Sequence, residues 1–239
     1  MRGIFITGTD TGVGKTVVSA ALLLALRGKS IDAGYMKPVA TGCVVKDGRL
    51  VSPDVQFIRE VCDIEDDDGL VSPVVFAPPV DPLTASAMAG RSIEMRVLED
   101  AYEELSGRHG FLVVEGIGGI AVPLGPGFDV CDLISALDLP ALVVIRPSLG
   151  TINHTILTVD YAMRRGVDVL ALVVNSASPG RAAGPAGRTG PELIERKLGI
   201  PVIAWLDYAP DFERDPDGSL LRLGPGLADR VAGIFKGWH

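Results

Sequence analysis

A glycine-rich loop near the start of the sequence carries the residue types that bind phosphate. Residues 7–16 read Thr-Gly-Thr-Asp-Thr-Gly-Val-Gly-Lys-Thr, with an apolar segment on each side. The glycines let backbone N–H groups turn toward an anion, Lys15 supplies a mobile cation, and the Thr16 hydroxyl can bind Mg²⁺. Five residues separate Gly8 from Gly14, one more than in the usual pattern. The sequence therefore predicts a variant phosphate-binding loop for a nucleoside triphosphate.

Two charged side chains follow other apolar, strand-like segments. Lys37 follows residues 34–36 and precedes Pro38, which keeps the chain extended. We expect its cation to face the ligand edge of a sheet, and a lysine lying along the surface is the alternative. Glu115 closes the apolar segment 111–114. An acid in this place, beside the strand of a phosphate loop, can hold Mg²⁺ directly or through water.

Asp54 is a further candidate metal ligand. It lies in the first turn of a helix that is predicted from Ser52 as N-cap and Pro53 at the first helical position. The helix dipole favours a carboxylate there whatever its function, so a purely structural role is the alternative. We expect Asp54, Glu115 and Thr16 to share one Mg²⁺ ion, because they offer the oxygen ligands that this ion prefers.

Two further segments follow predicted strands. Residues 149–154, Leu-Gly-Thr-Ile-Asn-His, come after the strand at 141–145 and open a helix, so their backbone N–H groups predict a second anion site. An ordinary N-cap at Thr151 is the alternative. Asn175 and Ser176 end another strand. The amide could read the edge of a base, or it could simply terminate the strand.

Apolar segments with the length of strands alternate with helical patterns along the sequence. The predicted strands span residues 3–7, 33–36, 111–115, 141–145, 169–175 and 201–205. This alternation predicts βαβ units, and hence an α/β fold with a mostly parallel sheet that helices flank on both faces, as in P-loop NTPases. In such a sheet ligands bind beyond the carboxyl ends of the strands. We expect a single domain over residues 1–239.

Two segments carry no strand or helix pattern. Residues 178–190 are so rich in Gly, Pro and Ala that they predict a flexible loop. The acidic run at 65–68 predicts a solvated surface turn.

Composition narrows the classes of function. The chain has a formal net charge of −8, which disfavours non-specific binding to nucleic acid. No apolar run reaches the roughly 20 residues that span a bilayer, and the start lacks the long apolar region of a signal peptide. We therefore expect a cytoplasmic protein with no nucleic-acid or membrane partner. Cys43, Cys62 and Cys131 are scattered, form no metal-ligand pattern, and are expected to be reduced thiols.

The motifs along the sequence match the pattern of one known family. They are the loop at 7–16, Lys-Pro-Val-Ala-Thr-Gly at 37–42, Asp54, Val-Glu-Gly-Ile-Gly-Gly at 114–119, Leu-Gly-Thr-Ile-Asn-His at 149–154, and Asn175. With these pieces in place, the chain closely resembles the dethiobiotin synthetase family. The glycine motifs alone would fit several P-loop families, so the lysine-proline motif and Leu-Gly-Thr-Ile-Asn-His make the assignment specific.

The resemblance implies a homodimeric enzyme that uses ATP and Mg²⁺ to join CO₂ to 7,8-diaminononanoate. One amine captures CO₂ as a carbamate, the carbamate oxygen attacks the γ-phosphate to form a mixed anhydride, and the neighbouring amine closes a ureido ring. The products would be dethiobiotin, ADP and phosphate.

The resemblance also implies a role for individual residues. Lys37 would stabilise the carbamate, Thr41 would hydrogen-bond it, and Lys15 would offset charge on the transferred phosphoryl group. The group implied to be catalytic is Lys37, Lys15 and Thr11. The residues implied to bind ATP are Gly12, Val13, Gly14, Lys15, Thr16, Val17, Asp54, Glu115, Gly116, Gly118, Asn175, Ser176, Ala204, Trp205, Leu206 and Asp211. The residues implied to bind the other substrate are Lys37 and Thr41 with Leu149, Gly150, Thr151, Ile152 and Asn153 of the partner subunit.

Two other classes of P-loop protein are alternatives. An amidotransferase-type ATPase of cobyrinate synthesis would need a glutaminase domain, for which 239 residues leave no room. A partitioning or division-site switch ATPase generally carries a second lysine early in the loop, where Thr9, Asp10 and Thr11 stand here. Formation of dethiobiotin, rather than slow hydrolysis stimulated by DNA or lipid, would separate these possibilities.

Overall fold

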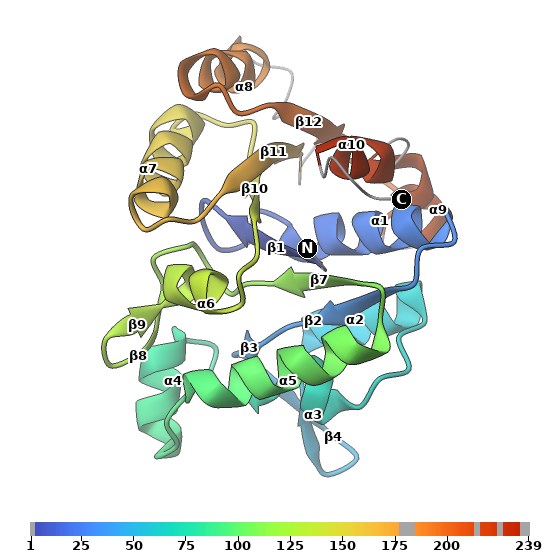
Figure 1. Ribbon diagram of the computed structural model, residues 1–239. Helices are drawn as coiled ribbons and strands as arrows, with labels where there is room; N and C mark the ends of the chain where they lie inside the picture. The colour runs from blue at the N-terminus through green and yellow to red at the C-terminus, as the bar shows by residue number, and fades with distance from the viewer. Residues whose placement is uncertain (1–2, 177–184, 213–215, 224–226, 235–239) are drawn as a thin grey trace.

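The computed structural model describes residues 3–176, 185–212, 216–223 and 227–234, and its centre is a parallel β-sheet (Figure 1). The six strands of this sheet pair in the order β12-β11-β10-β1-β7-β2, and every neighbouring pair is parallel. The strands are β1 (Gly3–Gly8), β2 (Ala33–Met36), β7 (Phe111–Glu115), β10 (Ala141–Ile145), β11 (Val169–Asn175) and β12 (Val202–Leu206). The α/β fold with a parallel sheet is therefore confirmed.

Successive residues of the strands face opposite sides of the sheet, and both sides are buried. Ile4 and Ile6 of β1 belong to one core cluster, whereas Phe5 between them belongs to the other side of the sheet. Val144 and Val143 of β10 divide in the same way. Because neither face meets water, the strands read as continuous apolar runs rather than as an alternating pattern. This explains why the sequence shows their positions so clearly.

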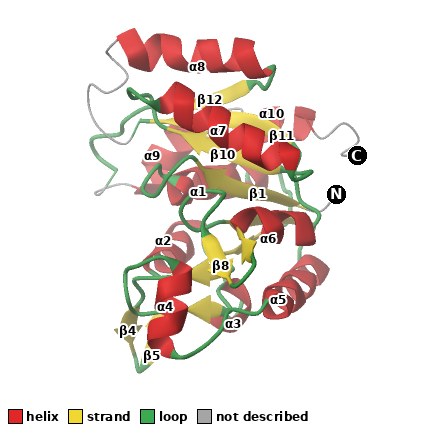
Figure 2. Ribbon diagram, turned by 90° about the vertical axis from the view of Figure 1, so that its left-hand side faces the viewer, coloured by secondary structure: helices red, strands yellow, loops and turns green. Residues whose placement is uncertain are grey.

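Helices cover both faces of the sheet (Figures 1 and 2). The face that carries Ile4 packs against α1 (Lys15–Arg27), α2 (Pro53–Cys62), α9 (Pro216–Leu223) and α10 (Leu227–Ile234). The opposite face packs against α5 (Met95–Arg108), α6 (Val130–Ala136), α7 (Thr151–Arg164) and α8 (Pro185–Leu198). Two short helices, α3 (Asp68–Val71) and α4 (Pro82–Ala89), complete the described set.

Within the described ranges, three two-stranded pairs lie outside the central sheet. They are the parallel pair β3 (Val39–Ala40) with β6 (Val74–Val75), the hairpin β4 (Val44–Lys46) with β5 (Arg49–Val51), and the antiparallel pair β8 (Pro123–Gly125) with β9 (Phe128–Asp129). Among the described residues, no helix is both long and apolar enough to cross a membrane.

The prediction of a loop over 178–190 is wrong for the part that the structure describes. Residues 185–190 are the first turns of α8, and the preceding residues of the segment lie outside the described ones. Gly190 is buried against α7, where a Cβ atom would lie 3.2 Å from a threonine methyl carbon of that helix. Ile194, further along α8, is buried against β10 and β11. Tertiary packing thus overrides the poor helix propensity of Gly and Pro.

A histidine joins three segments at the amino-terminal edge of the sheet. The Nδ1 atom of His109, just before β7, lies 2.9 Å from Asp32 Oδ1, just before β2. Its Nε2 atom lies 2.8 Å from Asp66 Oδ2, in the loop before α3. Partial burial lowers the pKa of His109, but the hydrogen bonds to both carboxylates outweigh that effect and the net shift is upward. His109 therefore ties these segments together, and the folded structure favours its protonated form more than the unfolded chain does.

Candidate active site at the phosphate-binding loop

Three neighbouring strands end at the edge of the sheet where the phosphate loop begins. In the register of β1 and β7, Ile6 pairs with Glu115, and in that of β2 and β7, Met36 pairs with Val114. The loop that follows β1, Lys37 after β2 and Glu115 at the end of β7 therefore meet at one place. This is the edge of the sheet at which the sequence predicts that ligands bind.

The ammonium group of Lys37 lies between two carboxylates. Its Nζ atom is 2.7 Å from Glu115 Oε1 and 2.7 Å from Asp54 Oδ2. The Thr16 hydroxyl donates a hydrogen bond of 2.8 Å to the same Oε1 atom of Glu115. The side chains of Lys37 and Glu115 are 4% and 0% exposed, whereas that of Asp54 is 45% exposed. The structure thus gathers the three predicted metal ligands around the lysine that was predicted to bind carbamate.

Charge compensation keeps this cluster ionised despite its burial. Burial lowers the pKa of Lys37, but the carboxylates of Glu115 and Asp54 more than offset it, so the pKa of Lys37 is raised. Burial raises the pKa of Asp54, and the ammonium of Lys37 together with hydrogen bonds from Lys37 and Thr16 brings it below its ordinary value. The centre of the site is therefore a buried cation held by two carboxylates.

The donor set fits Mg²⁺. Two carboxylates and a hydroxyl converge, and the ammonium of Lys37 already stands in for a cation where the two carboxylates meet. Within the described part of the chain, no three or more His, Cys, Asp or Glu side chains form a group that could hold a metal. The protein would thus supply few ligands, which suits Mg²⁺, since this ion keeps several waters and binds substrate phosphates.

Lys15 is held inside the phosphate loop. Its side-chain nitrogen donates to the carbonyl oxygens of Gly118 at 2.6 Å and Asp10 at 3.2 Å. Burial, and then the neighbouring ammonium of Lys37, lower the pKa of Lys15 to about 8. Helix α1 begins at Lys15 with Gly14 as its N-cap, which gives no side-chain hydrogen bond. An anion such as phosphate can satisfy the N–H groups of that first turn.

The residues predicted to frame the base lie at the ends of two neighbouring strands. Asn175 pairs with Leu206, and the Ser176 N–H donates to the Leu206 carbonyl at 2.8 Å. The Asn175 amide is buried and donates to the Val13 carbonyl at 2.9 Å. This hydrogen bond fixes the phosphate loop to the end of β11. Its contact with the loop is so close that a Cβ atom on Gly14 would lie 1.9 Å from Asn175 Nδ2.

The other predicted ATP-binding residues lie around these elements. Val13 is fully buried, Ala204 is nearly so, and Trp205 is 39% exposed on the outermost strand. Asp211 is exposed in the segment after β12. Gly12, Val17, Gly116 and Gly118 flank the ends of β1 and β7, as expected from their sequence positions.

The predicted second anion site lies at the start of α7. Gly150, with φ of 92°, is the N-cap and makes no side-chain cap, so Thr151 is the first helical residue rather than the cap. The Thr151 hydroxyl is buried and has no hydrogen-bond partner among the described residues, whereas Leu149 is 92% exposed. Ile152 and Asn153 are also exposed. Thr41, after β3, is partly exposed.

Sequence reasoning missed two residues that contact this site. The Tyr35 hydroxyl donates to Glu115 Oε2 at 2.9 Å. Burial, and then the charge of Glu115, raise the pKa of Tyr35 well above its ordinary value. Arg146 pairs with Asp10 at 2.6 Å and donates to the Thr11 carbonyl at 3.2 Å. Its position directly after the predicted strand 141–145 could have suggested this contact.

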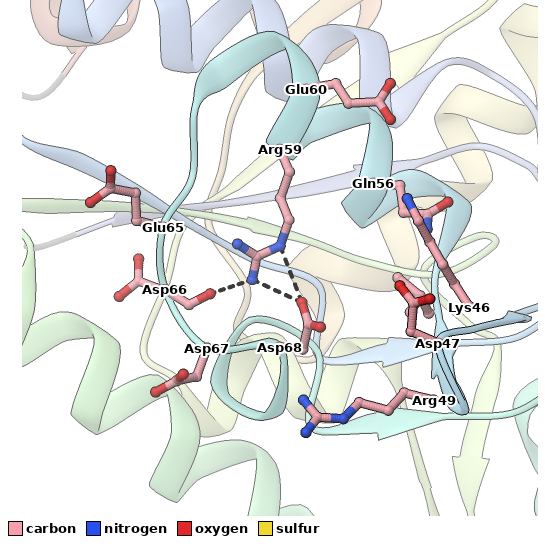
Figure 3. Close-up of a pocket in the computed structure, with 11 residues that line it drawn as sticks. Lys46, Asp47, Arg49, Gln56, Arg59, Glu60, Glu65, Asp66, Asp67 and Asp68 are labelled. Atoms are coloured by element: carbon pink, nitrogen blue, oxygen red, sulfur yellow. Dashed lines mark hydrogen bonds and ion pairs between the residues drawn. The ribbon is translucent and has the colours of Figure 1, made fainter.

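A separate hollow of about 690 Å³ lies between the hairpin β4–β5, the end of α2 and the acidic run (Figure 3). Among the described residues, its lining includes none of the predicted site residues. The acidic run is not simply the solvated turn that was expected. Arg59 pairs with Asp68 at 2.8 Å and donates to the Asp66 carbonyl, while the Asp66 carboxylate binds His109.

Cys43, Cys62 and Cys131 are buried, and no disulfide joins them within the part of the chain that the structure describes. Burial, and then the charge of Asp129, raise the pKa of Cys131 to about 11. Burial also raises the pKa of Cys43. Neither of these two thiols has the low pKa of a reactive cysteine.

Comparison with solved structures shows that other proteins share this fold. The MinC:MinD cell division protein complex of Aquifex aeolicus is similar with a TM-score of 0.60 at 15% identity, over 98% of this chain and 96% of that one. The ParA family ATPase of Chlorobium tepidum has a TM-score of 0.57 at 15% identity, over 98% of this chain and 99% of that one. At this identity the likeness concerns the fold alone.

Sequence comparison identifies the family. A family model described as an AAA domain matches residues 2–215. The ATP-dependent dethiobiotin synthetase BioD of Bacillus licheniformis is 40% identical over 203 residues, which cover 85% of this chain and 84% of that protein. The protein of the same name from Anaeromyxobacter sp. strain K is 41% identical over 214 residues, 90% of this chain and 93% of that protein. The chain belongs to the dethiobiotin synthetase family.

Proposed function

We propose that this protein is an ATP- and Mg²⁺-dependent enzyme that forms dethiobiotin from 7,8-diaminononanoate and CO₂, with release of ADP and phosphate. Its family membership supports the overall reaction. The single structural observation that carries the proposal is the buried Lys37 ammonium, which lies between Glu115 and Asp54 and shares Glu115 Oε1 with Thr16 of the phosphate loop. It supports the proposal because a carbamate anion needs a cation beside the triphosphate, and Lys37 would supply it.

The reaction proceeds in three steps. One amine of the diamine attacks CO₂, forms a C–N bond and loses a proton to give a carbamate. A carbamate oxygen then attacks the γ-phosphorus of ATP, and the bond to the β-phosphate oxygen breaks to release ADP. The second amine attacks the carbonyl carbon of the resulting anhydride, phosphate leaves, and the ureido ring closes.

The side chains divide this work by position. Lys37 offers its ammonium to the carbamate oxygen, and Lys15 compensates the charge of the transferred phosphoryl group. Thr16, Asp54 and Glu115 would hold Mg²⁺, which neutralises charge on the phosphate oxygens. Asn175 holds the phosphate loop through Val13. Because little covalent chemistry falls to the protein in such a transfer, catalysis rests on placing these charges.

We further propose that the active site is shared between the two subunits of a homodimer. The start of α7 offers N–H groups without a side-chain cap, which suit a carboxylate. This segment lies on the surface, because the side chains of Leu149, Ile152 and Asn153 are exposed. A second subunit would contact it there. The distal carboxylate of the substrate would bind there, and the energy of that contact would position the reacting amines.

An assay of coupled turnover tests the reaction. ATP consumption is measured with and without 7,8-diaminononanoate and bicarbonate, and mass spectrometry detects the product. We expect ADP and dethiobiotin in equal amounts. Lys15→Ala should impair phosphoryl transfer above all, whereas Lys37→Ala should bind ATP in calorimetry but lose turnover of the diamine. Hydrolysis of ATP that ignores the diamine and rises with DNA or lipid would instead favour a switch ATPase.

Mixed dimers test the shared site. Lys37→Ala and Asn153→Trp are each expected to be nearly inactive as homodimers. After they are unfolded and refolded together, about half of the dimers should be mixed, and each mixed dimer has one site with neither lesion. Activity should then return to about a quarter of wild type. If native mass spectrometry shows mixed dimers that recover no activity, each site lies within one chain.

A further inference from the structure

Tyr35 lies directly behind the carboxylate of Glu115. Strands β2 and β7 are neighbours, and Tyr35 pairs with Val113 in their register. Because side chains alternate along a strand, Val113 and Glu115 project from the same face, and Tyr35 belongs to the same core cluster as Val113. Tyr35 is 0% exposed, and its hydroxyl reaches Glu115 Oε2 at 2.9 Å.

The two oxygens of the Glu115 carboxylate have separate partners. Oε1 accepts from Thr16 at 2.8 Å and lies 2.7 Å from Lys37 Nζ, whereas Oε2 accepts from Tyr35. The terminal torsion of a glutamate is broad, so packing alone defines the carboxylate plane poorly. A hydrogen bond on Oε2 fixes that plane and leaves Oε1 directed toward Thr16 and Lys37.

The hydroxyl of Tyr35 is not needed for packing, because a phenylalanine ring would fill the same space in the core. The ring lies in an apolar cluster with α1 and β7, where an unused hydroxyl would be costly to bury. Its hydrogen bond to Glu115 offsets that cost. The polar atom is therefore explained by the carboxylate that it contacts rather than by the core around it.

We propose that Tyr35 is a positioning residue, which orients the Glu115 carboxylate so that Oε1 faces the metal and the reacting groups. Because Tyr35 is fully buried, it acts through Glu115. The inference rests on the proposed function only in taking Glu115 as a metal ligand, and it makes no assumption about which substrate is carboxylated.

The test compares two substitutions that each remove one tyrosine hydroxyl from a carboxylate. Tyr35→Phe removes the donor to Glu115. Tyr161→Phe is the matched control, because the Tyr161 hydroxyl donates to the Asp129 carboxylate, which belongs to the N-terminal cap of α6. Mn²⁺ serves as the probe for the metal, and its binding to the ATP-bound protein is followed by electron paramagnetic resonance. Titrations are run at a temperature at which circular dichroism shows both variants folded.

We expect Tyr35→Phe to weaken Mn²⁺ binding by about tenfold, the low end of the loss that follows when a hydrogen-bond partner of a metal ligand is removed. The concentration of Mg²⁺ for half-maximal activity should rise in parallel, with a lower kcat and little change in the KM for the diamine. Tyr161→Phe should leave both quantities unchanged. In the background of Glu115→Gln, Tyr35→Phe should add little, because the two residues act as one unit.

Two results would overturn the inference. Equal Mn²⁺ affinity in wild type and Tyr35→Phe would show that the tyrosine is only a core residue. If Tyr35→Phe weakens Mn²⁺ binding as much in the Glu115→Gln background as in wild type, Tyr35 does not act through Glu115. Failure of the proposed function is distinguishable, since a wild-type protein that makes no dethiobiotin can still bind Mn²⁺ more tightly than its Tyr35→Phe variant.

Discussion

Replacing Glu115 with Gln should destabilise the protein far more than replacing Asp54 with Asn, although both carboxylates contact the same ammonium. Each substitution keeps the shape of the side chain and removes its negative charge. Glu115 is 0% exposed and Asp54 is 45% exposed, while Lys37 between them is 4% exposed. The two variants therefore remove a buried and a half-solvated partner from one buried cation.

The magnitude follows from the burial of the pair. Removing one partner of a buried ion pair costs about 3–5 kcal/mol, because the other charge stays buried without compensation. Asp54 remains beside Lys37 in Glu115→Gln, so we expect the lower end, about 3 kcal/mol. For a chain of this length that is a melting temperature lower by about 6–12 °C. Asp54→Asn removes a partly solvated charge, and we expect less than about 1 kcal/mol.

Urea denaturation, followed by far-ultraviolet circular dichroism without nucleotide or metal, measures both costs. The double variant Lys37→Met/Glu115→Gln supplies the control, because it removes both buried charges and should be less destabilised than the sum of the single variants. An equal cost for Glu115→Gln and Asp54→Asn would refute the reasoning from burial. So would a cost for Glu115→Gln within about 0.5 kcal/mol of zero, the range of ordinary surface changes.

Three further outcomes can be measured on the same protein. The stability advantage of wild type over His109→Gln should be complete below about pH 6.5 and should shrink as pH rises through the raised pKa of His109, as unfolding at several pH values would show. Asn175→Ala should cost about 1–3 kcal/mol, because it removes a buried donor to the phosphate loop, and calorimetry should show weaker nucleotide binding. Gly14→Ala should abolish nucleotide binding in the same assay, since its φ of 91° and its contact with the Asn175 amide leave no room for a methyl group.

The strands of the central sheet could be predicted from the sequence because both of their faces are buried. Strands β2, β7, β10 and β11 begin and end at the residues expected from their apolar runs, and β1 extends one residue further than expected. The last strand is displaced by one residue, from 201–205 to Val202–Leu206. A strand that is buried on both faces has a strongly apolar composition, and the first polar or glycine residue marks its end. The residues at those ends could therefore be named from the sequence.

The contacts between those residues could not be predicted in the same way. Tyr35 reads as one more apolar residue of a buried strand, and only the register of β2 against β7 reveals what its hydroxyl meets. The prediction of a loop at 185–190, where α8 begins, failed for a related reason. Its composition argues against a helix, and the decisive contribution comes from packing on α7, which no local pattern encodes.

The sharing of Glu115 shows why the site depends on the topology of the sheet. Among the described residues, its hydrogen-bond and ion-pair partners come from α1, β2 and the residue after β2. They are brought together because β7 lies between β1 and β2. A buried carboxylate is tolerable only when its oxygens are satisfied and its charge is compensated. Folding therefore has to complete this cluster before any ligand arrives. The Lys37 cation and the carboxylate oxygens are thus held in position at the phosphate loop before ligands bind, so binding does not have to order these side chains. A reaction that depends on the placement of charge requires such preorganisation.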